Sequence, residues 1–245
     1  MRPDRLNAAI GGLFVVGSAC FVVGSVPAYA DAVGADADAL TYFAGSIFFT
    51  SASFLQLMQA RATGRRDRNW LAAVFQFPGT ILFNVSTLVA LVHNLSVQQQ
   101  DRHVWRPDLV GSTLFIVASV FGVLAVGGAG ASARDRWIAW LNMAGSAFFM
   151  TAALAAYVLP GSGEVLDIRV DLAGTLLGAV CFLVGAALLI PVHPLRRRSH
   201  DRPGRRRPVR QSIRHARSAD PGVPGGRHDG PGRVPPRRRG PGPGG

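Results

Sequence analysis

The sequence contains no lysine, few charged residues and only two cysteines. Charged residues make up 16% of its 245 residues, whereas soluble proteins carry about 25%. All 26 basic residues are arginine, and we assign no mechanism to the absence of lysine. Cys20 and Cys181 both lie in apolar runs, outside any metal-binding or disulfide spacing. These absences argue against a soluble domain, a disulfide framework and a cysteine metal site.

The net charge of +12 belongs entirely to the C-terminal segment. Residues 1–195 carry 11 arginines and 11 acidic residues, whereas residues 196–245 carry 15 arginines and 3 acidic residues. This last segment also has 10 glycines, 9 prolines and no aromatic residue, so it cannot bury enough apolar surface to offset its ordering entropy. We therefore expect a transmembrane domain at 1–195 and a disordered, basic cytoplasmic tail at 196–245.

Long apolar runs dominate residues 1–195. Hydrophobic residues make up 49% of the chain, and six segments reach the roughly 20 residues that a helix needs to cross a bilayer. The short alternating strands of a membrane barrel are absent from the sequence. The sequence predicts an all-α polytopic membrane protein whose six transmembrane helices form three repeated hairpins, at 7–60, 70–129 and 137–193. The individual spans are expected at 7–29, 39–60, 70–93, 109–129, 137–159 and 171–193.

Arginine placement predicts how the spans are oriented. The side with the N-terminus and the inter-hairpin loops carries 8 arginines, against 3 on the other side. The positive-inside rule then places both termini in the cytoplasm, and we expect the inner (plasma) membrane of a bacterial cell. An alternative is that Arg2 and Arg5, the first apolar run and Ala28-Tyr29-Ala30 form a cleavable signal peptide, which would leave five helices.

A glycine followed by small and then aromatic or bulky apolar residues recurs in the six spans. Small residues allow helix backbones to approach closely in a bilayer, so we interpret the pattern as a helix-packing signal. A glycine-lined pore or ligand groove is the alternative. The six glycines are Gly11, Gly45, Gly79, Gly111, Gly145 and Gly174.

These segments resemble a known family. G-G-L-F-V-V-G-S-A-C-F-V-V-G-S at 11–25 and F-A-G-S-I-F-F at 43–49 resemble the YrhK-like membrane domain, a two-helix hairpin with a Gly-x-x-Phe-x-x-Gly-Ser type of pattern. Residues 142–149 and 173–186 resemble another copy, while the middle hairpin departs more, with Pro78 before its glycine and Asn84 in place of a small residue. The resemblance implies a membrane hairpin of uncharacterised function and brings no catalytic residues.

Polar residues inside spans are the usual pointers to transport. Gln76 and Asn84 flank Pro78 in the third span and form a candidate polar site. Hydrogen bonding around a proline kink is the other interpretation. We expect no carboxylate or arginine within the spans that would relay protons or hold a coupling ion.

The sequence carries no recognised catalytic, nucleotide-binding or metal-binding motif, so we expect no enzyme, no cofactor and no metal. The function predicted is that of a non-enzymatic integral membrane protein. One alternative is a small-solute transporter or channel with its polar site on the third helix. Another is a membrane-anchored tether whose tail binds anionic lipid head groups; nucleic acid is the weaker partner, because the tail has no aromatic residue for base stacking. A solvated positive-inside anchor without a partner is the other interpretation of the tail. The oligomeric state is left open.

Overall fold

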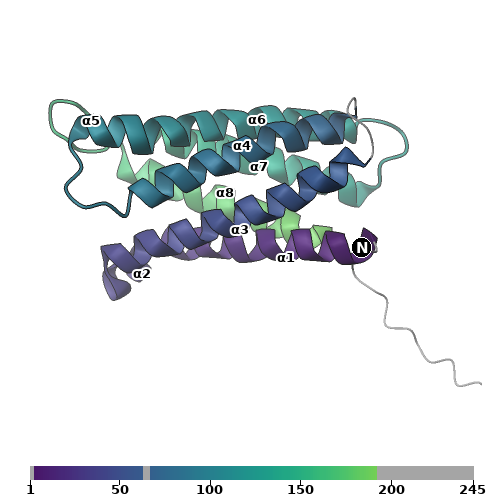
Figure 1. Cartoon of the computed structure of the whole chain (residues 1–245), viewed down its shortest axis with the longest axis horizontal. Helices are drawn as coiled ribbons and strands as arrows, with labels where there is room; N and C mark the ends of the chain where they lie inside the picture. The colour runs from purple at the N-terminus through teal and green to yellow at the C-terminus, as the bar shows by residue number, and fades with distance from the viewer. Residues whose placement is uncertain (1–2, 63–66, 192–245) are drawn as a thin grey trace, which may run out of the picture. The chain divides into compact units, whose positions relative to one another are not determined.

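The computed structural model describes residues 3–62 and 67–191, and this part of the chain is all-α (Figure 1). It contains six helices long and apolar enough to cross a membrane, as the sequence predicted. The chain is therefore a multi-pass integral membrane protein. The tail expected at 196–245 lies outside the described residues.

The six long helices form three hairpins. The first hairpin pairs α1 (Pro3–Gly24) with α3 (Ala35–Arg61), and the short α2 (Pro27–Val33) lies in its loop. The second pairs α4 (Arg68–Val89) with α6 (Arg106–Ala125) through α5 (Val97–Gln100) and a π-helical turn, η1 (Asp101–Trp105). The third pairs α7 (Ala133–Ala155) with α8 (Ile168–Leu189). A helix of 22 residues, such as α4, is about 33 Å long and matches the bilayer core of about 30 Å.

Several helices begin and end earlier than the apolar spans suggested. The α7 helix begins at Ala133 rather than 137, because the Ser132 hydroxyl and the Asp135 carboxylate form a capping box around its first turn. The α4 helix likewise begins at Arg68 behind an Asp67 cap and ends at Val89 rather than 93. Hydropathy marks residues that lipid tolerates, whereas helix ends are set by backbone hydrogen bonds and caps.

The six long helices close into a ring. Each packs against two neighbours in the order α1, α3, α4, α6, α7 and α8, and α8 packs back against α1. The loops within the hairpins lie at one end of this ring, at the left of Figure 1 with α2 and α5, and the start of α1 lies at the other. We call these the hairpin-loop end and the terminal end.

Paired glycines bring the two helices of each hairpin together. A Cβ added to Gly17 would lie 2.9 Å from the carbonyl oxygen of Gly45, and one added to Gly45 would lie 3.1 Å from that of Gly17. The same reciprocal contact joins Gly79 to Gly111 and Gly145 to Gly178. We call these six residues the crossing glycines. These backbones approach so closely that a methyl group does not fit between them.

In the first and last helices the residues at these crossings are Gly17 and Gly178. The sequence analysis had singled out Gly11 and Gly174 in these two helices. Gly11 instead faces α8, where an added Cβ would lie 3.0 Å from the carbonyl oxygen of Ala186. Gly174 faces α7 at the Phe148 carbonyl oxygen, 2.9 Å from an added Cβ. All six glycines of the sequence analysis therefore lie at close helix contacts.

Hydroxyl groups join neighbouring hairpins. Ser46 on α3 shares a hydrogen bond of 2.9 Å with Thr87 on α4, and Ser146 on α7 shares one of 2.8 Å with Ser119 on α6. Each pair combines the residue directly after one crossing glycine with the residue eight positions after another. In the third pair of neighbouring hairpins the residue directly after Gly17 is Ser18, and the residue eight positions after Gly178 is Ala186, which has no hydroxyl. The Ser18 hydroxyl accordingly has no partner among the described residues.

The outer surface of the ring is apolar. Large aliphatic and aromatic side chains from all six long helices are exposed there, including Val16, Ile47, Ile81, Val120, Leu154 and Leu177. The buried polar residues are, by contrast, serines and threonines. This arrangement suits a bundle in lipid, where small polar residues pack inside and aliphatic residues face the acyl chains.

Candidate functional site

Six phenylalanines fill the middle of the ring. Each lies four residues after a crossing glycine, so every long helix contributes one: Phe21, Phe49, Phe83, Phe115, Phe149 and Phe182. Four residues span about 6 Å along a helix, so each phenylalanine lies about 6 Å from its crossing glycine along the helix axis. Because the two helices of a hairpin run in opposite directions, their phenylalanines are displaced toward opposite ends of the ring. The rings are therefore divided between two levels.

The first helices supply one triangle of rings, Phe21, Phe83 and Phe149, with centroids 5.6–6.5 Å apart. The second helices supply another, in which Phe182 lies 5.8 Å from Phe49 and 6.2 Å from Phe115. The space enclosed by the six rings is only about 10 Å³, room for about one water molecule. We call these rings the double phenylalanine layer.

A cavity of about 490 Å³ lies on the hairpin-loop side of this layer. Its floor is the Phe21, Phe83 and Phe149 triangle, and its wall carries the carboxylates of Asp108 and Asp171. No arginine or histidine is among the described residues that line it. We call it the acidic cavity; its other polar lining residues are Tyr42, Ser86, Thr87, Asn94, Gln100, Trp105 and Thr175.

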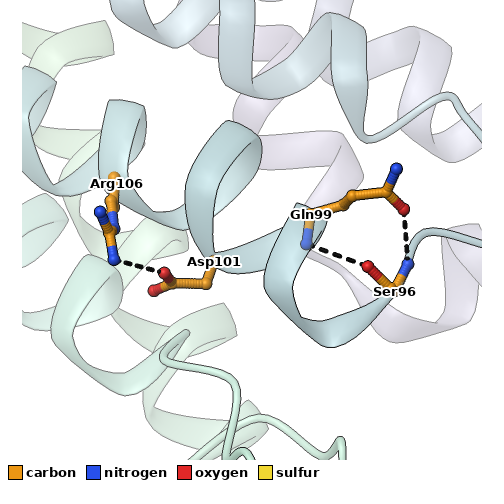
Figure 2. Close-up of polar contacts among 4 residues, drawn as sticks. All are labelled: Ser96, Gln99, Asp101 and Arg106. Carbon is orange, nitrogen blue, oxygen red and sulfur yellow. Dashed lines mark hydrogen bonds and ion pairs between the residues drawn. The ribbon is translucent and has the colours of Figure 1, made fainter.

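A capped and ion-paired segment brings several of these residues to the cavity. Figure 2 shows Ser96 and Gln99 exchanging hydrogen bonds of 2.9 and 3.3 Å around the start of α5. The same figure shows Asp101 bound to Arg106 at 2.8 Å across the π-helical turn. These contacts hold the helix that carries Asp108.

A second polar space lies on the terminal side of the phenylalanine layer. It comprises a cavity of about 590 Å³ and an adjoining one of about 80 Å³ against Phe49, Phe115 and Phe182. Gln56, Gln76 and Asn142 line both. We call this space the amide cavity.

The structure separates the two polar residues that the sequence singled out. Gln76 lines the amide cavity and donates a hydrogen bond of 3.3 Å to the side-chain oxygen of Gln56. Asn84 instead points to α3, where its amide donates to the Thr50 hydroxyl at 2.9 Å. Pro78 lies inside α4 without ending it. Gln76 and Asn84 therefore do not form one site.

Sequence reasoning missed the acidic cavity, because it placed Asp108 before a span and Asp171 at the end of one. The structure extends α6 and α8 to include both residues in their first turns. A signal was present in the sequence, because D-L-V-G-S at 108–112 and D-L-A-G-T at 171–175 repeat an aspartate three residues before a glycine. In the structure Asp108 precedes its crossing glycine, Gly111, by three residues, and Asp171 precedes Gly178 by seven. No cluster of three or more potential metal ligands occurs among the described residues.

Six apolar helices in a closed ring, with a polar cavity at each end, define an integral membrane protein with an occluded axis. No protein-family model matches the chain, and no curated protein or solved structure matches it either.

Proposed function

We propose that the protein is a gated membrane pathway for a small solute, which acts without covalent chemistry. The observation that carries this proposal is the pair of polar cavities on the axis of the ring, separated by the double phenylalanine layer. In this arrangement a solute can enter from either end and is stopped in the middle.

The free-energy cost of polar side chains inside the bundle favours a transport function over a purely structural one. Polar side chains inside membrane-spanning helices are expensive and are usually retained where they line a solute path. A bundle that served only for packing would gain by filling about 490 Å³ of space with apolar side chains. Movement of the phenylalanine rings would then open the path, as hydrophobic constrictions do in channels.

A matched pair of variants tests the pathway. Phe149 is 5% exposed in the phenylalanine layer, whereas its neighbour Phe148 is 36% exposed on the outer surface. The full chain is reconstituted in liposomes, and glycerol entry is followed by light scattering. We expect Phe149→Ala to raise glycerol entry and Phe148→Ala to leave it at the wild-type rate. Equal rates for the two variants would contradict the pathway.

A second pair tests which polar residue serves the solute. Gln76→Leu removes an amide from the amide cavity, while Asn84→Leu removes a hydrogen bond between α3 and α4. We expect Gln76→Leu to lower uptake and Asn84→Leu to lower the stability of the bundle without lowering uptake per folded molecule. An equal loss of uptake per folded molecule in both variants would restore the shared site of Gln76 and Asn84 first expected from the sequence.

The wider setting is also part of the proposal. The Gly-Ser-x-x-Phe segments support membership of a YrhK-like group of membrane hairpins, and the arginine distribution supports a bacterial inner membrane with cytoplasmic termini. The basic tail would then contact anionic lipid head groups. Protease protection of a tag at each terminus of the chain in inverted vesicles tests the orientation.

A further inference from the structure

The acidic cavity holds two carboxyl groups, those of Asp108 and Asp171, and no basic side chain among its described lining residues faces them. Asp108 has no hydrogen-bond or ion-pair partner among the described residues, and Asp171 receives one long hydrogen bond, 3.5 Å from the Thr175 hydroxyl. The nearest arginine along the chain, Arg106, is bound to Asp101 instead (Figure 2). A carboxylate without a counter-charge in a low-dielectric setting is destabilised as an anion, and either a proton or a bound cation relieves this penalty.

A buried hydroxyl supplies a second, independent indication of a ligand. Ser86 is 6% exposed, lines the same cavity from α4 and makes no side-chain hydrogen bond among the described residues. Hydroxyls of buried residues are normally hydrogen-bonded. The unpartnered hydroxyls of Ser18, Ser53 and Ser112 are enclosed by protein, whereas Ser86 lines the cavity, where a partner that enters from outside can reach it. Ser86 and Asp108 lie on the adjacent helices α4 and α6, which places a hydroxyl and a carboxyl group on neighbouring walls.

The aromatic walls narrow the class of cation. The Tyr42 hydroxyl donates a hydrogen bond of 3.1 Å to the Ser25 hydroxyl, and Trp105 donates its indole N–H to the Ala153 carbonyl at 2.8 Å. Both rings are thus held in place, and Phe21, Phe83 and Phe149 complete an apolar floor. Aromatic rings beside carboxylates bind organic ammonium groups, whose alkyl surface a small inorganic ion lacks.

We propose that the acidic cavity is the binding site for a small organic cation of the alkylammonium class, the solute of the proposed pathway on which this inference rests. The ammonium group would lie between Asp108 and Asp171, with its alkyl substituents against the aromatic rings. A cavity of about 490 Å³ is in the size range of ordinary small-molecule sites.

Calorimetry on the full chain in lipid nanodiscs tests the proposal. The probe is choline, and its neutral analogue of the same shape, 3,3-dimethylbutan-1-ol, isolates the charge. We expect saturable choline binding that is at least about tenfold tighter than binding of the alcohol. Equal affinities would overturn the proposal. Because this comparison uses the wild-type protein, it does not depend on any variant folding.

Variants locate the site. We expect Asp108→Asn and Asp171→Asn each to weaken choline binding about tenfold or more, and Ser86→Ala to weaken it less. Glu164→Gln is the matched control, because Glu164 is an exposed carboxylate at the same end of the ring, and its removal should change nothing. Unchanged affinity in both aspartate variants would overturn the site, and equally strong competition by sodium would overturn the organic class.

Uptake into liposomes separates this inference from the proposed function. Choline that binds as described but never crosses the membrane would support the binding site and contradict the pathway. Glycerol that crosses without any choline binding would support the pathway and contradict the binding site.

Discussion

Replacement of Gly17 by alanine tests whether backbone contact at the crossing glycines holds the bundle together. An added methyl group would lie 2.9 Å from the carbonyl oxygen of Gly45 and 3.2 Å from the backbone nitrogen of Phe49. Ordinary van der Waals contact begins at 3.4 Å, so α1 and α3 would have to separate by about 0.5 Å at the crossing. The nearest atom of all, Cδ2 of Phe49 at 2.6 Å, belongs to a ring packed in the phenylalanine layer, and the other two are backbone atoms that cannot move aside.

Gly12 provides a control within the same helix. A Cβ added there meets no atom within 4 Å. Both substitutions gain about 0.5–1 kcal/mol because alanine loses less backbone entropy than glycine in a helix. The difference between the two variants therefore isolates the steric cost of overpacking, which we expect to be about 1–3 kcal/mol.

The assay is unfolding of the full chain from detergent micelles with sodium dodecyl sulfate, followed by circular dichroism. We expect Gly12→Ala to be as stable as the wild type or slightly more stable, and Gly17→Ala to unfold at a lower denaturant fraction. The reasoning is refuted if the two variants have the same free energy of unfolding.

Two further predictions follow from the contacts between helices. Ser146→Ala removes a hydrogen bond of 2.8 Å to Ser119 and should cost about 0.6 kcal/mol in the same unfolding assay. Ser112→Ala, which removes a buried hydroxyl that has no partner among the described residues, should be neutral, and an equal loss in both variants would argue against the inter-hairpin bond. Arg134 donates hydrogen bonds to the Leu188 and Ile190 carbonyls at the end of α8, so Arg134→Gln should speed amide exchange in the last turn of that helix. Arg136→Gln, at an exposed position of the same helix, should not, and equal exchange in both variants would exclude this capping role.

The register of the helix crossings illustrates what a repeat in the sequence leaves undecided. Gly11 and Gly17 both precede phenylalanines in the first span, and Gly174 and Gly178 both lie in the last. Local sequence does not distinguish them, because each is small enough to permit close approach. Only the packed structure brings Gly17 opposite Gly45 and Gly178 opposite Gly145. In α1 the choice depends on rotation about the helix axis, because Gly11 faces α8 and Gly17 faces α3. In α8 it depends on the position along the axis, because Gly174 and Gly178 both face α7.

Gln76 and Asn84 make the same point for the candidate site. Both are amides in one span, and the sequence alone suggested a shared role. They are eight residues apart, and side chains at that spacing can face different neighbours. The structure turns Gln76 toward the axis and Asn84 toward Thr50.

The sequence by itself determined the class of protein and the number and kind of its spans. A helix in lipid must satisfy its own backbone hydrogen bonds, so length and hydropathy suffice to identify it. The ring closed by α1 and α8, the double phenylalanine layer and the two cavities were decided only by tertiary structure. They depend on contacts between segments as distant as Phe21 and Phe149, whose rings lie 5.8 Å apart; the repeat relates the two residues but does not place their rings in contact.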